Sequence, residues 1–376
     1  MKHAIEELIP GYIRGLPAYV PGRPVEEVER ELNVRAVKLA SNENPMGPSP
    51  LAIEAAKRAL SDANWYPDGG SKALREKLAA RHGVKPEETF VALGSSEIID
   101  LAARALLRPG LEGITSEKSY APYSLGIRAA GAELVLAPMR GYTYDLTAIA
   151  RRMTPRTRLV YLANPNNPTG TAFGHDELDQ FLGEALPHIL VVLDEAYLHY
   201  ADRKDMPRAE ELHRKHGNLL IVRTFSKVYG LAGLRIGYGI GAPEVLSVFR
   251  QLKTPFNTSV VAQVAAIAAL DDTEHVRRSV ETNRVERRRL IAGLERIGLQ
   301  AVPSETNFVF VEMGPEAPRV CEELLRRGVI VRPLGWMGLP GAARISVGRP
   351  EENDRFLAAI GEIWPAHAAK RELAER

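Results

Sequence analysis

Three short apolar runs in the middle of the chain constrain its fold most strongly. They are LVYLA (159–163), ILVVLD (189–194) and LLIVRTF (219–225), and each is continuously apolar rather than alternating with polar residues. Strands buried on both faces, as in a parallel sheet covered by helices, have this pattern. Amphipathic helix candidates occur at SSEIIDLAARALL and GHDELDQFLGEAL. The middle of the chain is therefore predicted to be α/β.

The last third of the chain has a different character. A long charged helix is predicted from residue 273, the apolar segments NFVFVEM, VIVRPL and ARISVG follow it, and a last helix begins at Pro350. Because 376 residues are many for one hydrophobic core, we expect a second, smaller α+β domain here. The predicted parts are an N-terminal arm with part of the small domain (1–46), a large domain (47–255), and a linker helix with the small C-terminal domain (256–376).

Charge and cysteine content limit the partners of the protein. The formal net charge is +2, and basic and acidic residues are scattered rather than gathered into blocks, so nucleic acid and acidic membranes are not expected as partners. The basic run RVERRRL (284–290) is interpreted as the solvated face of a helix. One cysteine, Cys321, excludes an internal disulfide and fits a reducing compartment.

The sequence also lacks the usual signs of export, membrane insertion and metal binding. The first residues have no apolar core of a signal peptide, and no apolar run approaches the roughly 20 residues of a membrane span. No histidine pair has metal-ligand spacing on a recognisable helix face, and Cys321 has no second thiol to work with. We expect a cytoplasmic protein with no metal and no membrane partner.

Polar residues follow each of the three apolar runs at the point where the strand should end. They are NPNNPTG after the first run, DEAY after the second and SK after the third. Ligands of open α/β sheets bind at the carboxyl ends of the strands. The sequence therefore predicts that these three segments serve one ligand.

Lys227, just after the third run, is the most informative single residue. Viewed alone, it could be a surface lysine at a helix start. Its place at the end of a buried strand, beside Thr224 and Ser226, also suits covalent chemistry. Burial and a nearby cation such as Arg235 would both disfavour the ammonium form. The free amine could then form a Schiff base with a carbonyl compound.

Asp194, the last residue of the second run, could act with Lys227. It could be a helix cap or part of a solvated turn. At the bottom of a pocket, its carboxylate would instead keep a pyridinium nitrogen protonated, which pyridoxal phosphate (PLP) needs to act as an electron sink. Tyr197 and Asn167 could hydrogen-bond the phenolate oxygen of that ring. The prolines and glycine around Asn167 would, however, produce a turn in any case.

A phosphate site is predicted where a helix follows the segment FVAL. Gly94, Ser95 and Ser96 open this helix, and the backbone N–H groups of a helix N-terminus bind anions. An ordinary serine N-cap is the alternative. The Ser226 hydroxyl and the Arg235 guanidinium would complete a phosphate cradle, since arginine offers a bidentate fork.

A family resemblance rests on an ordered set of motifs. They are SNENPMGPSP, NWYPDGG, GSSE, NPNNPTG, DEAY, TFSKVYGLAGLRIGY and RISVG. The set resembles the fold-type I PLP-dependent aminotransferases, most closely their histidinol-phosphate branch, and it extends over nearly the whole chain. The resemblance implies a mostly parallel seven-stranded sheet in a large PLP-binding domain, PLP as cofactor and a homodimer. It also implies that a small-molecule amino donor and a 2-oxo acid are the substrates.

The resemblance implies roles for the residues that match the cofactor site of the family. Lys227 would carry PLP and move the substrate proton, Asp194 would pair with the pyridine nitrogen, and Asn167 and Tyr197 would contact the ring oxygen. The phosphate site would comprise Gly94, Ser95, Ser96, Ser226 and Arg235, with Thr224 as a weaker candidate.

The aromatic residues of the site are less well defined. Tyr120 would stack on the cofactor ring, although Tyr123 lies close to it in the sequence. Tyr66 of NWYPDGG matches a tyrosine that reaches the phosphate of the neighbouring subunit. If it does so here, each active site needs a dimer.

Four further residues match the substrate pocket of the family. Arg344 of RISVG resembles the arginine that binds the substrate α-carboxylate, with a solvated arginine at a strand end as the alternative. Tyr19, Asn44 and Arg332 lie where the family builds its pocket, and Arg332 could face an anionic side chain.

The sequence departs from the histidinol-phosphate pattern at three positions. Leu93 replaces an asparagine that is common there, and Trp336 and Met337 replace a smaller or differently shaped pair. We expect transamination of L-histidinol phosphate with 2-oxoglutarate, a step of histidine biosynthesis. These departures make an aromatic amino acid aminotransferase the main alternative. A threonine-phosphate decarboxylase and a PLP-binding regulator without turnover are further alternatives, the last disfavoured because the chain has no helix-turn-helix or basic arm.

Overall fold

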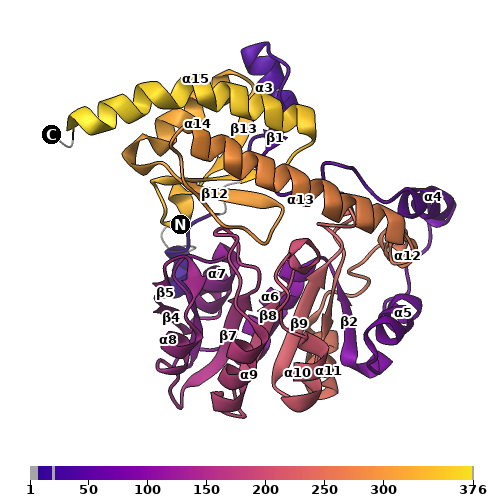
Figure 1. Ribbon diagram of the computed structural model, residues 1–376. Helices are drawn as coiled ribbons and strands as arrows, with labels where there is room; N and C mark the ends of the chain where they lie inside the picture. Colours follow the sequence, from indigo (N-terminus) through magenta and orange to yellow (C-terminus); the bar gives the residue numbers. More distant parts are fainter. Residues whose placement is uncertain (1–6, 19–21, 375–376) are drawn as a thin grey trace.

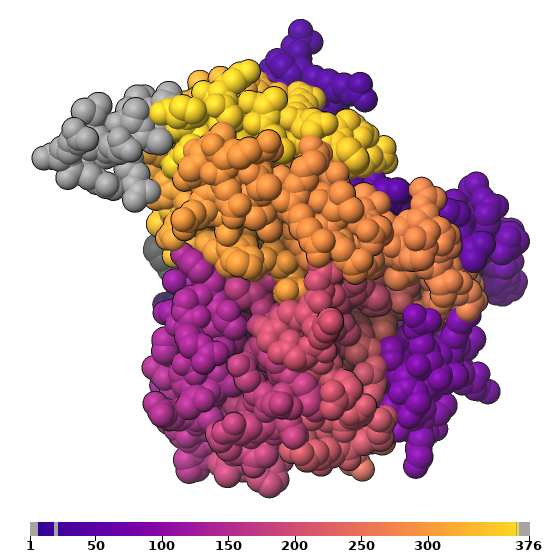
Figure 2. All heavy atoms as spheres, in the orientation of Figure 1, coloured from indigo at the N-terminus to yellow at the C-terminus, as the bar shows by residue number. Residues whose placement is uncertain are grey.

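Two β-sheets organise the chain in the computed structural model, which describes residues 7–18 and 22–374. A seven-stranded sheet with its helices forms the lower part of Figure 1, and a five-stranded sheet with the C-terminal helices forms the upper part. The two parts touch over a broad front in the space-filling view of Figure 2. The predicted α/β class is confirmed.

The seven-stranded sheet contains the three apolar runs of the sequence. Its strands, in spatial order, are β2 (Thr89–Ala92), β10 (Gly237–Ile240), β9 (Leu219–Thr224), β8 (Leu190–Asp194), β7 (Thr157–Ala163), β3 (Glu112–Ser116) and β4 (Glu133–Ala137). All neighbouring strands are parallel except that β10 is antiparallel to both β2 and β9. Nearly every residue of β7, β8 and β9 is buried, as their continuous apolar pattern predicts.

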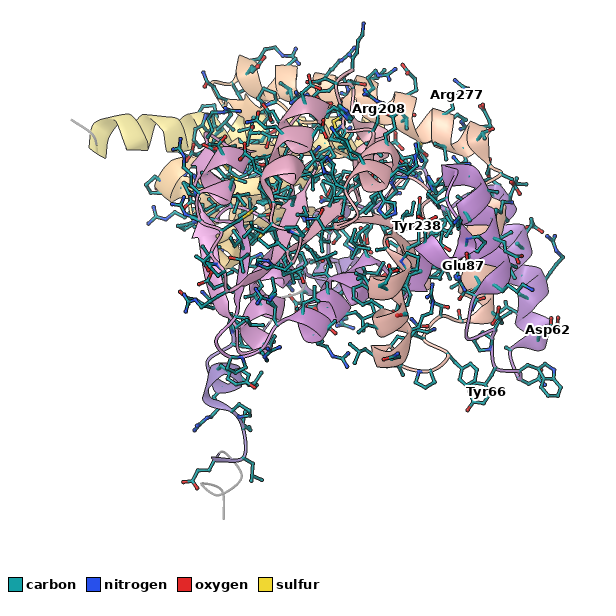
Figure 3. The ribbon with its side chains drawn as sticks, turned by 90° about the horizontal axis from the view of Figure 1, so that it is seen from below. Asp62, Tyr66, Glu87, Arg208, Tyr238 and Arg277 are labelled. Carbon is teal, nitrogen blue, oxygen red and sulfur yellow. The ribbon has the colours of Figure 1, made fainter. Side chains whose placement is uncertain are left out.

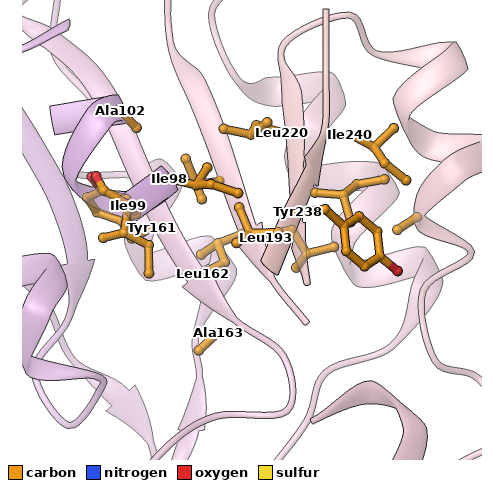
Figure 4. Close-up of a cluster of buried hydrophobic side chains, with 14 of the residues drawn as sticks. Ile98, Ile99, Ala102, Tyr161, Leu162, Ala163, Leu193, Leu220, Tyr238 and Ile240 are labelled. Atoms are coloured by element: carbon orange, nitrogen blue, oxygen red, sulfur yellow. The ribbon is translucent and has the colours of Figure 1, made fainter. Parts of the chain in front are cut away.

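Helices pack around this sheet. Those that contact its strands are α5 (Lys72–His82), α6 (Ser95–Leu106), α7 (Ala121–Ala129), α8 (Leu146–Ala150), α10 (Ala209–Lys215) and α11 (Pro243–Leu252). Helix α9 (His175–Glu184) packs on α8, and α4 (Pro50–Ala59) packs on α12 (Val260–Ala269), which also contacts α5. Figure 4 shows Ile98 of α6 in one cluster with Leu162, Leu193 and Leu220 of the strands. Burying one such side chain contributes about 1.5–3 kcal/mol, so this packing fixes α6 on the sheet.

The five-stranded sheet joins the N-terminal part of the chain to the C-terminal part. Its strands, in spatial order, are β1 (Val37–Leu39), β13 (Val329–Pro333), β14 (Ala342–Ser346), β12 (Phe308–Glu312) and β11 (Ala301–Val302). Strand β1 pairs with β13 in parallel, with Val37 opposite Val329. The helices around this sheet are α3 (Val25–Leu32), α13 (Thr273–Arg296), α14 (Ala317–Arg326) and α15 (Pro350–Ala374).

Smaller elements connect these layers. They are α2 (Gly11–Arg14), the hairpin of β5 (Met139–Arg140) and β6 (Thr143–Tyr144), and the 3-10 turns η1 (Leu60–Asp62), η2 (Pro86–Glu88), η3 (Leu198–Tyr200), η4 (Ala232–Leu234), η5 (Gly314–Glu316) and η6 (Gly335–Met337). Helix α12 adds Ala262 and Ala266 to the hydrophobic cluster of the large sheet. The division of the chain into 1–46, 47–255 and 256–376 stays a prediction. None of the described helices is long and apolar enough to cross a membrane.

Arg287 of α13 joins the two parts of the fold. It is buried, and its Nη1 donates hydrogen bonds to the backbone oxygens of Tyr200 (3.0 Å) and Thr306 (2.7 Å). Its Nη2 pairs with Asp202 at 2.9 Å. The interpretation of residues 284–290 as a solvated face is therefore wrong for Arg287. Its partners belong to other segments of the chain, and folding brings them into contact with its side chain.

Candidate active site

A pocket lies between the two sheets, at the carboxyl ends of the central strands. Ala163, Asp194 and Thr224, the last residues of β7, β8 and β9, contribute to one side of it, and Arg332 and Arg344 of the small sheet to another. The pocket has a cavity volume of about 280 Å³. This is close to the lower end of the usual range for small-molecule sites.

Most of the predicted site residues line this pocket. They are Ser95, Ser96, Tyr120, Asn167, Asp194, Tyr197, Thr224, Ser226, Lys227, Arg235, Arg332 and Arg344. Trp336 and Met337 line it as well. Residues of NPNNPTG, DEAY and SK thus line one pocket, and that they serve one ligand stays a prediction.

Other predicted residues lie elsewhere. Asn44 is not among the pocket-lining residues, because its amide donates hydrogen bonds to the backbone oxygen of Val228 (2.8 Å) and to Ser279 Oγ (2.9 Å). Its side chain thus joins the N-terminal segment to α13 instead of facing the pocket. Leu93 is 46% exposed and lies outside the lining. Tyr19 falls outside the described residues.

Tyr66 projects from the edge of the molecule, away from the pocket of its own chain (Figure 3). Its side chain is 81% exposed, and its ring stacks on Phe256 with 4.7 Å between the ring centroids. A contact between Tyr66 and an active site would therefore need a second copy of the chain.

The Lys227 amine lies at the floor of the pocket. Its Nζ donates to the backbone oxygens of Ser41 (3.3 Å) and Asn42 (3.2 Å), and it lies 5.4 Å from the centre of the Tyr197 ring. Burial, together with the positive charge of Arg344, lowers the pKa of Lys227 from 10.5 to about 7. Much of this amine is thus uncharged near neutral pH and can act as a nucleophile or a base.

The Asp194 carboxylate ends β8 close to Lys227. Its Oδ2 accepts a hydrogen bond from the Tyr123 hydroxyl at 2.8 Å, and its Oδ1 accepts one from the backbone N–H of Ala196 at 3.0 Å. Burial raises the pKa of Asp194 above its usual value. A buried carboxylate is costly without a positive partner, so this side chain suits a cation bound in the pocket.

The two tyrosines that the sequence could not separate have different surroundings. Tyr123 is fully buried, uses its hydroxyl on Asp194 and stacks on Tyr161 with 4.9 Å between ring centroids. Tyr120 lies edge-on to Tyr123, and its hydroxyl lies 3.5 Å from Ser96 Oγ. Of the two, Tyr120 is the better placed to stack on a ligand.

An anion cradle lies at the N-terminus of α6. Gly94 precedes the helix at φ +74°, and a Cβ built on it would lie 2.7 Å from Arg235 Nη2. Arg235 Nη1 donates to Ser226 Oγ at 3.4 Å. The free N–H groups of the first helical turn, the serine hydroxyls and the guanidinium together suit a phosphate.

A second cationic group lines the pocket from the small sheet. Arg332 and Arg344 are directly paired across β13 and β14, and they are only 7% and 8% exposed. The Arg344 guanidinium donates to Asn167 Oδ1 (2.5 Å) and to the backbone oxygen of Ala40 (2.8 Å). The Arg332 guanidinium lies 4.8 Å from the centre of the Trp336 ring. Residues directly opposite each other on antiparallel strands have their side chains on the same face, so both guanidinium groups can bind an anion in the pocket.

Sequence reasoning missed several residues of this pocket. The pocket is lined by Ala40, Ser41, Asn42 and Glu43, at and just before the start of the motif SNENPMGPSP. The sequence predicted only Asn44 of this motif as a site residue. Asn42 adopts φ +56°, a left-handed conformation that one sequence does not reveal. Within residues 7–18 and 22–374, no group of three or more His, Cys, Asp or Glu side chains could hold a metal ion.

Comparison with known proteins gives consistent matches over most of the chain. Residues 34–360 match the family model described as aminotransferase class I and II. A histidinol-phosphate aminotransferase of Anaeromyxobacter sp. is 48% identical, over 96% of this chain and all of that relative. Histidinol-phosphate aminotransferase 2 of Pseudomonas fluorescens is 45% identical, over 93% of this chain and 96% of that relative.

Solved structures share the fold. The histidinol-phosphate aminotransferase from Sinorhizobium meliloti, in complex with pyridoxal-5'-phosphate, superimposes with a TM-score of 0.88 at 30% identity, over 95% of this chain and 98% of that chain. The aspartate aminotransferase from Thermus thermophilus with maleate superimposes with a TM-score of 0.80 at 27% identity, over 93% of this chain and 99% of that chain.

Proposed function

Because the chain belongs to the class I and II aminotransferase family, we propose that it transfers the amino group of L-histidinol phosphate to 2-oxoglutarate, giving imidazole acetol phosphate and glutamate. The protein is a PLP-dependent aminotransferase. Relatives that are 45% and 48% identical bear the name histidinol-phosphate aminotransferase, which supports this substrate.

The residues of the pocket fit PLP. The cradle of Gly94, Ser95, Ser96, Ser226 and Arg235 would hold its phosphate, because it combines helix N–H groups with a guanidinium. Lys227 would hold it through its amine. Asp194 would face its ring nitrogen, Asn167 and Tyr197 its ring oxygen, and Tyr120 one face of the ring, with Thr224 nearby. When bound, PLP supplies the electron sink that makes the proton on the amine-bearing carbon acidic.

Lys227 is the base that we propose for this proton. Its Nζ, with a pKa lowered to about 7, can take up the proton and return it at neutral pH. Asp194 would keep a positive charge on the ring nitrogen, since its own carboxylate is buried and accepts hydrogen bonds from Tyr123 and Ala196. Arg332 and Arg344 of the small sheet line the same pocket, opposite the strand ends of the large sheet.

The buried pair of Arg332 and Arg344 is the observation that carries the substrate assignment. L-histidinol phosphate has a phosphate and no α-carboxylate, whereas 2-oxoglutarate has two carboxylates. Paired residues on adjacent strands can bind the phosphate of the first substrate and a carboxylate of the second in turn. A phosphate carries about −1.5 to −2 charges near neutral pH, whereas a carboxylate carries one. Two guanidinium groups therefore match the charge of a phosphate better than that of a single carboxylate.

One observation favours an aromatic amino acid as the competing donor. Trp336 and Met337 both line the pocket, with the Trp336 ring over Arg332. They would offer an apolar surface to a phenylalanine ring.

The relative kcat/KM values of L-histidinol phosphate and phenylalanine, with 2-oxoglutarate as acceptor, test the substrate assignment. We expect L-histidinol phosphate to be the better donor. A preference for phenylalanine would replace the proposal with the aromatic aminotransferase. Release of CO₂ from threonine phosphate would point to the decarboxylase, and the absence of any turnover would point to a regulator.

We also propose that the protein acts as a homodimer. Trp65, Tyr66 and Phe256 are exposed, and Tyr66 stacks on Phe256; a second copy would remove these rings from water. Tyr66 would then reach the phosphate cradle of the partner subunit. Mixing Tyr66→Phe and Lys227→Ala subunits tests this, because hybrid dimers would regain one intact site and part of the activity. The cytoplasmic location stays a prediction.

A further inference from the structure

Asn42 lies where the two sheets meet at the pocket. It is 1% exposed and follows β1, the edge strand of the small sheet. Its φ of +56° is left-handed, a conformation in which asparagine is several-fold enriched among non-glycine residues. The roles proposed above do not use this residue, although it contacts Lys227, Tyr197, Asn307 and Ser346.

Ser346 fixes the orientation of the Asn42 amide. The backbone N–H of Asn42 donates to Ser346 Oγ at 2.8 Å, so this oxygen already accepts one hydrogen bond. Its hydroxyl hydrogen then donates to Asn42 Oδ1 at 2.9 Å. With Oδ1 turned toward Ser346, the Nδ2 of Asn42 must turn the other way.

Asn42 Nδ2 donates to the Tyr197 hydroxyl oxygen at 3.0 Å. This phenol oxygen therefore acts as an acceptor toward Asn42, and its own hydrogen must point elsewhere. Tyr197 lines the pocket, and the Phe308 ring packs against it with 5.1 Å between ring centroids. Burial raises the pKa of Tyr197, so the phenol keeps its hydrogen near neutral pH.

The backbone of Asn42 contacts the catalytic amine as well. Its carbonyl oxygen accepts hydrogen bonds from Lys227 Nζ at 3.2 Å and from Asn307 Nδ2 at 3.0 Å. Ser346, in turn, lies two residues after Arg344 on β14. One residue thus connects the strand of the proposed substrate arginine to both Tyr197 and Lys227.

We propose that Asn42 is a positioning residue for the transamination: its amide, oriented by Ser346, directs the hydroxyl hydrogen of Tyr197 into the pocket. This inference rests on the proposed function, because it takes Tyr197 as the residue that contacts the ring oxygen of PLP. The amide acts through Tyr197, and its removal weakens the binding of PLP.

Two substitutions separate this role from a purely structural one. Asn42→Gly keeps a residue that tolerates positive φ and removes the amide. Asn42→Asp keeps the shape and replaces the Nδ2 donor with an acceptor. The control is Asn33→Gly, because Asn33 also has positive φ (50°) but is exposed at the end of α3. Ser346→Ala leaves Asn42 in place and frees its amide to rotate.

The readout is the Kd for PLP of the full-length protein stripped of cofactor, with the melting temperature measured alongside. Asn42→Gly and Asn42→Asp should raise this Kd about tenfold, roughly the effect of one hydrogen bond. Ser346→Ala should raise it less, and Asn33→Gly should leave it unchanged. An unchanged Kd in both Asn42 variants would overturn the proposal, as would an equal loss in Asn33→Gly.

A double-mutant cycle with Tyr197→Phe shows whether Asn42 acts through Tyr197. In the Tyr197→Phe background, Asn42→Gly should change the Kd less than twofold. A full tenfold loss in that background would overturn the proposal. An unchanged Kd in Tyr197→Phe alone would also overturn it. Failure of the proposed function is seen separately, as a wild-type enzyme that does not use L-histidinol phosphate.

Discussion

The Tyr123 hydroxyl donates a 2.8 Å hydrogen bond to the Asp194 carboxylate at the end of β8. This bond stabilises the ionised form of Asp194, against the burial that raises its pKa. The carboxylate must be ionised to pair with a protonated ring nitrogen. Tyr123, whose role the sequence left open, therefore helps to keep the Asp194 carboxylate ionised at the cofactor site.

Tyr123→Phe should shift the acid limb of the kcat/KM profile. Without the hydrogen bond, the pKa of Asp194 rises further, so the active ionised form is lost at a higher pH. We expect an upward shift of roughly 0.5–1 pH unit. Tyr161→Phe is the matched control, because it also removes a buried phenol hydrogen bond, to the backbone oxygen of Ile99. Equal shifts in both variants would contradict this role of Tyr123.

Lys227→Met should stabilise the cofactor-free protein at acid pH and abolish transamination. The folded protein lowers the pKa of Lys227 from 10.5 to about 7, so it binds fewer protons than the unfolded chain between these values. The free energy of unfolding therefore falls as pH drops from 10.5 to 7, and the whole loss remains below 7. Melting temperatures at pH 6 and pH 10 measure this. The gain from Lys227→Met should be larger at pH 6, and a lower melting temperature for this variant at pH 6 would contradict the prediction.

Arg344→Met should impair substrate binding while leaving the cofactor in place. Loss of one buried guanidinium should lower kcat/KM for L-histidinol phosphate by about 100-fold or more. The Kd for PLP should rise about tenfold at most, because Asn167 loses one hydrogen bond while the cradle around Arg235 stays intact. Arg326→Met, at an exposed arginine of α14, is the control. Unaltered kcat/KM in Arg344→Met would remove this residue from the substrate site.

Gly94→Ala should weaken PLP binding by crowding the phosphate cradle. A Cβ at this position would lie 2.7 Å from Arg235 Nη2. Gly298→Ala is matched in backbone strain, at φ +80°, but no described atom lies within 4 Å of its Cβ. Both variants should lose about 1–2 kcal/mol of stability from the left-handed backbone, and only Gly94→Ala should raise the Kd for PLP. A similar Kd in the two variants would argue against the cradle.

The sequence predicted those features that depend on local pattern and strand order. Continuous apolar runs identified β7, β8 and β9, and their carboxyl ends placed Asp194 and Lys227 at one site. Contacts between distant segments were not predictable in this way. Arg287 resembles a solvated arginine until Asp202, Tyr200 and Thr306 surround it.

The motif SNENPMGPSP shows the same limit within a few residues. Asn44 and Asn42 are both asparagines next to Glu43, yet Asn44 binds Ser279 of α13 and Asn42 faces Tyr197 in the pocket. Between the two lies the left-handed backbone of Asn42 (φ +56°), which the sequence alone does not reveal. Tyr66 is a related case, because its proposed function depends on a second chain.

The most direct test of the account is a single-turnover absorbance measurement on the PLP-loaded protein. L-histidinol phosphate is added without any 2-oxo acid, and wild type is compared with Lys227→Ala. We expect wild type to lose the visible absorbance of its bound cofactor within the first turnover and to regain it when 2-oxoglutarate follows. The Lys227→Ala variant should not complete this cycle. A wild-type spectrum that L-histidinol phosphate leaves unchanged, or a Lys227→Ala variant that cycles as wild type does, would contradict the central claim.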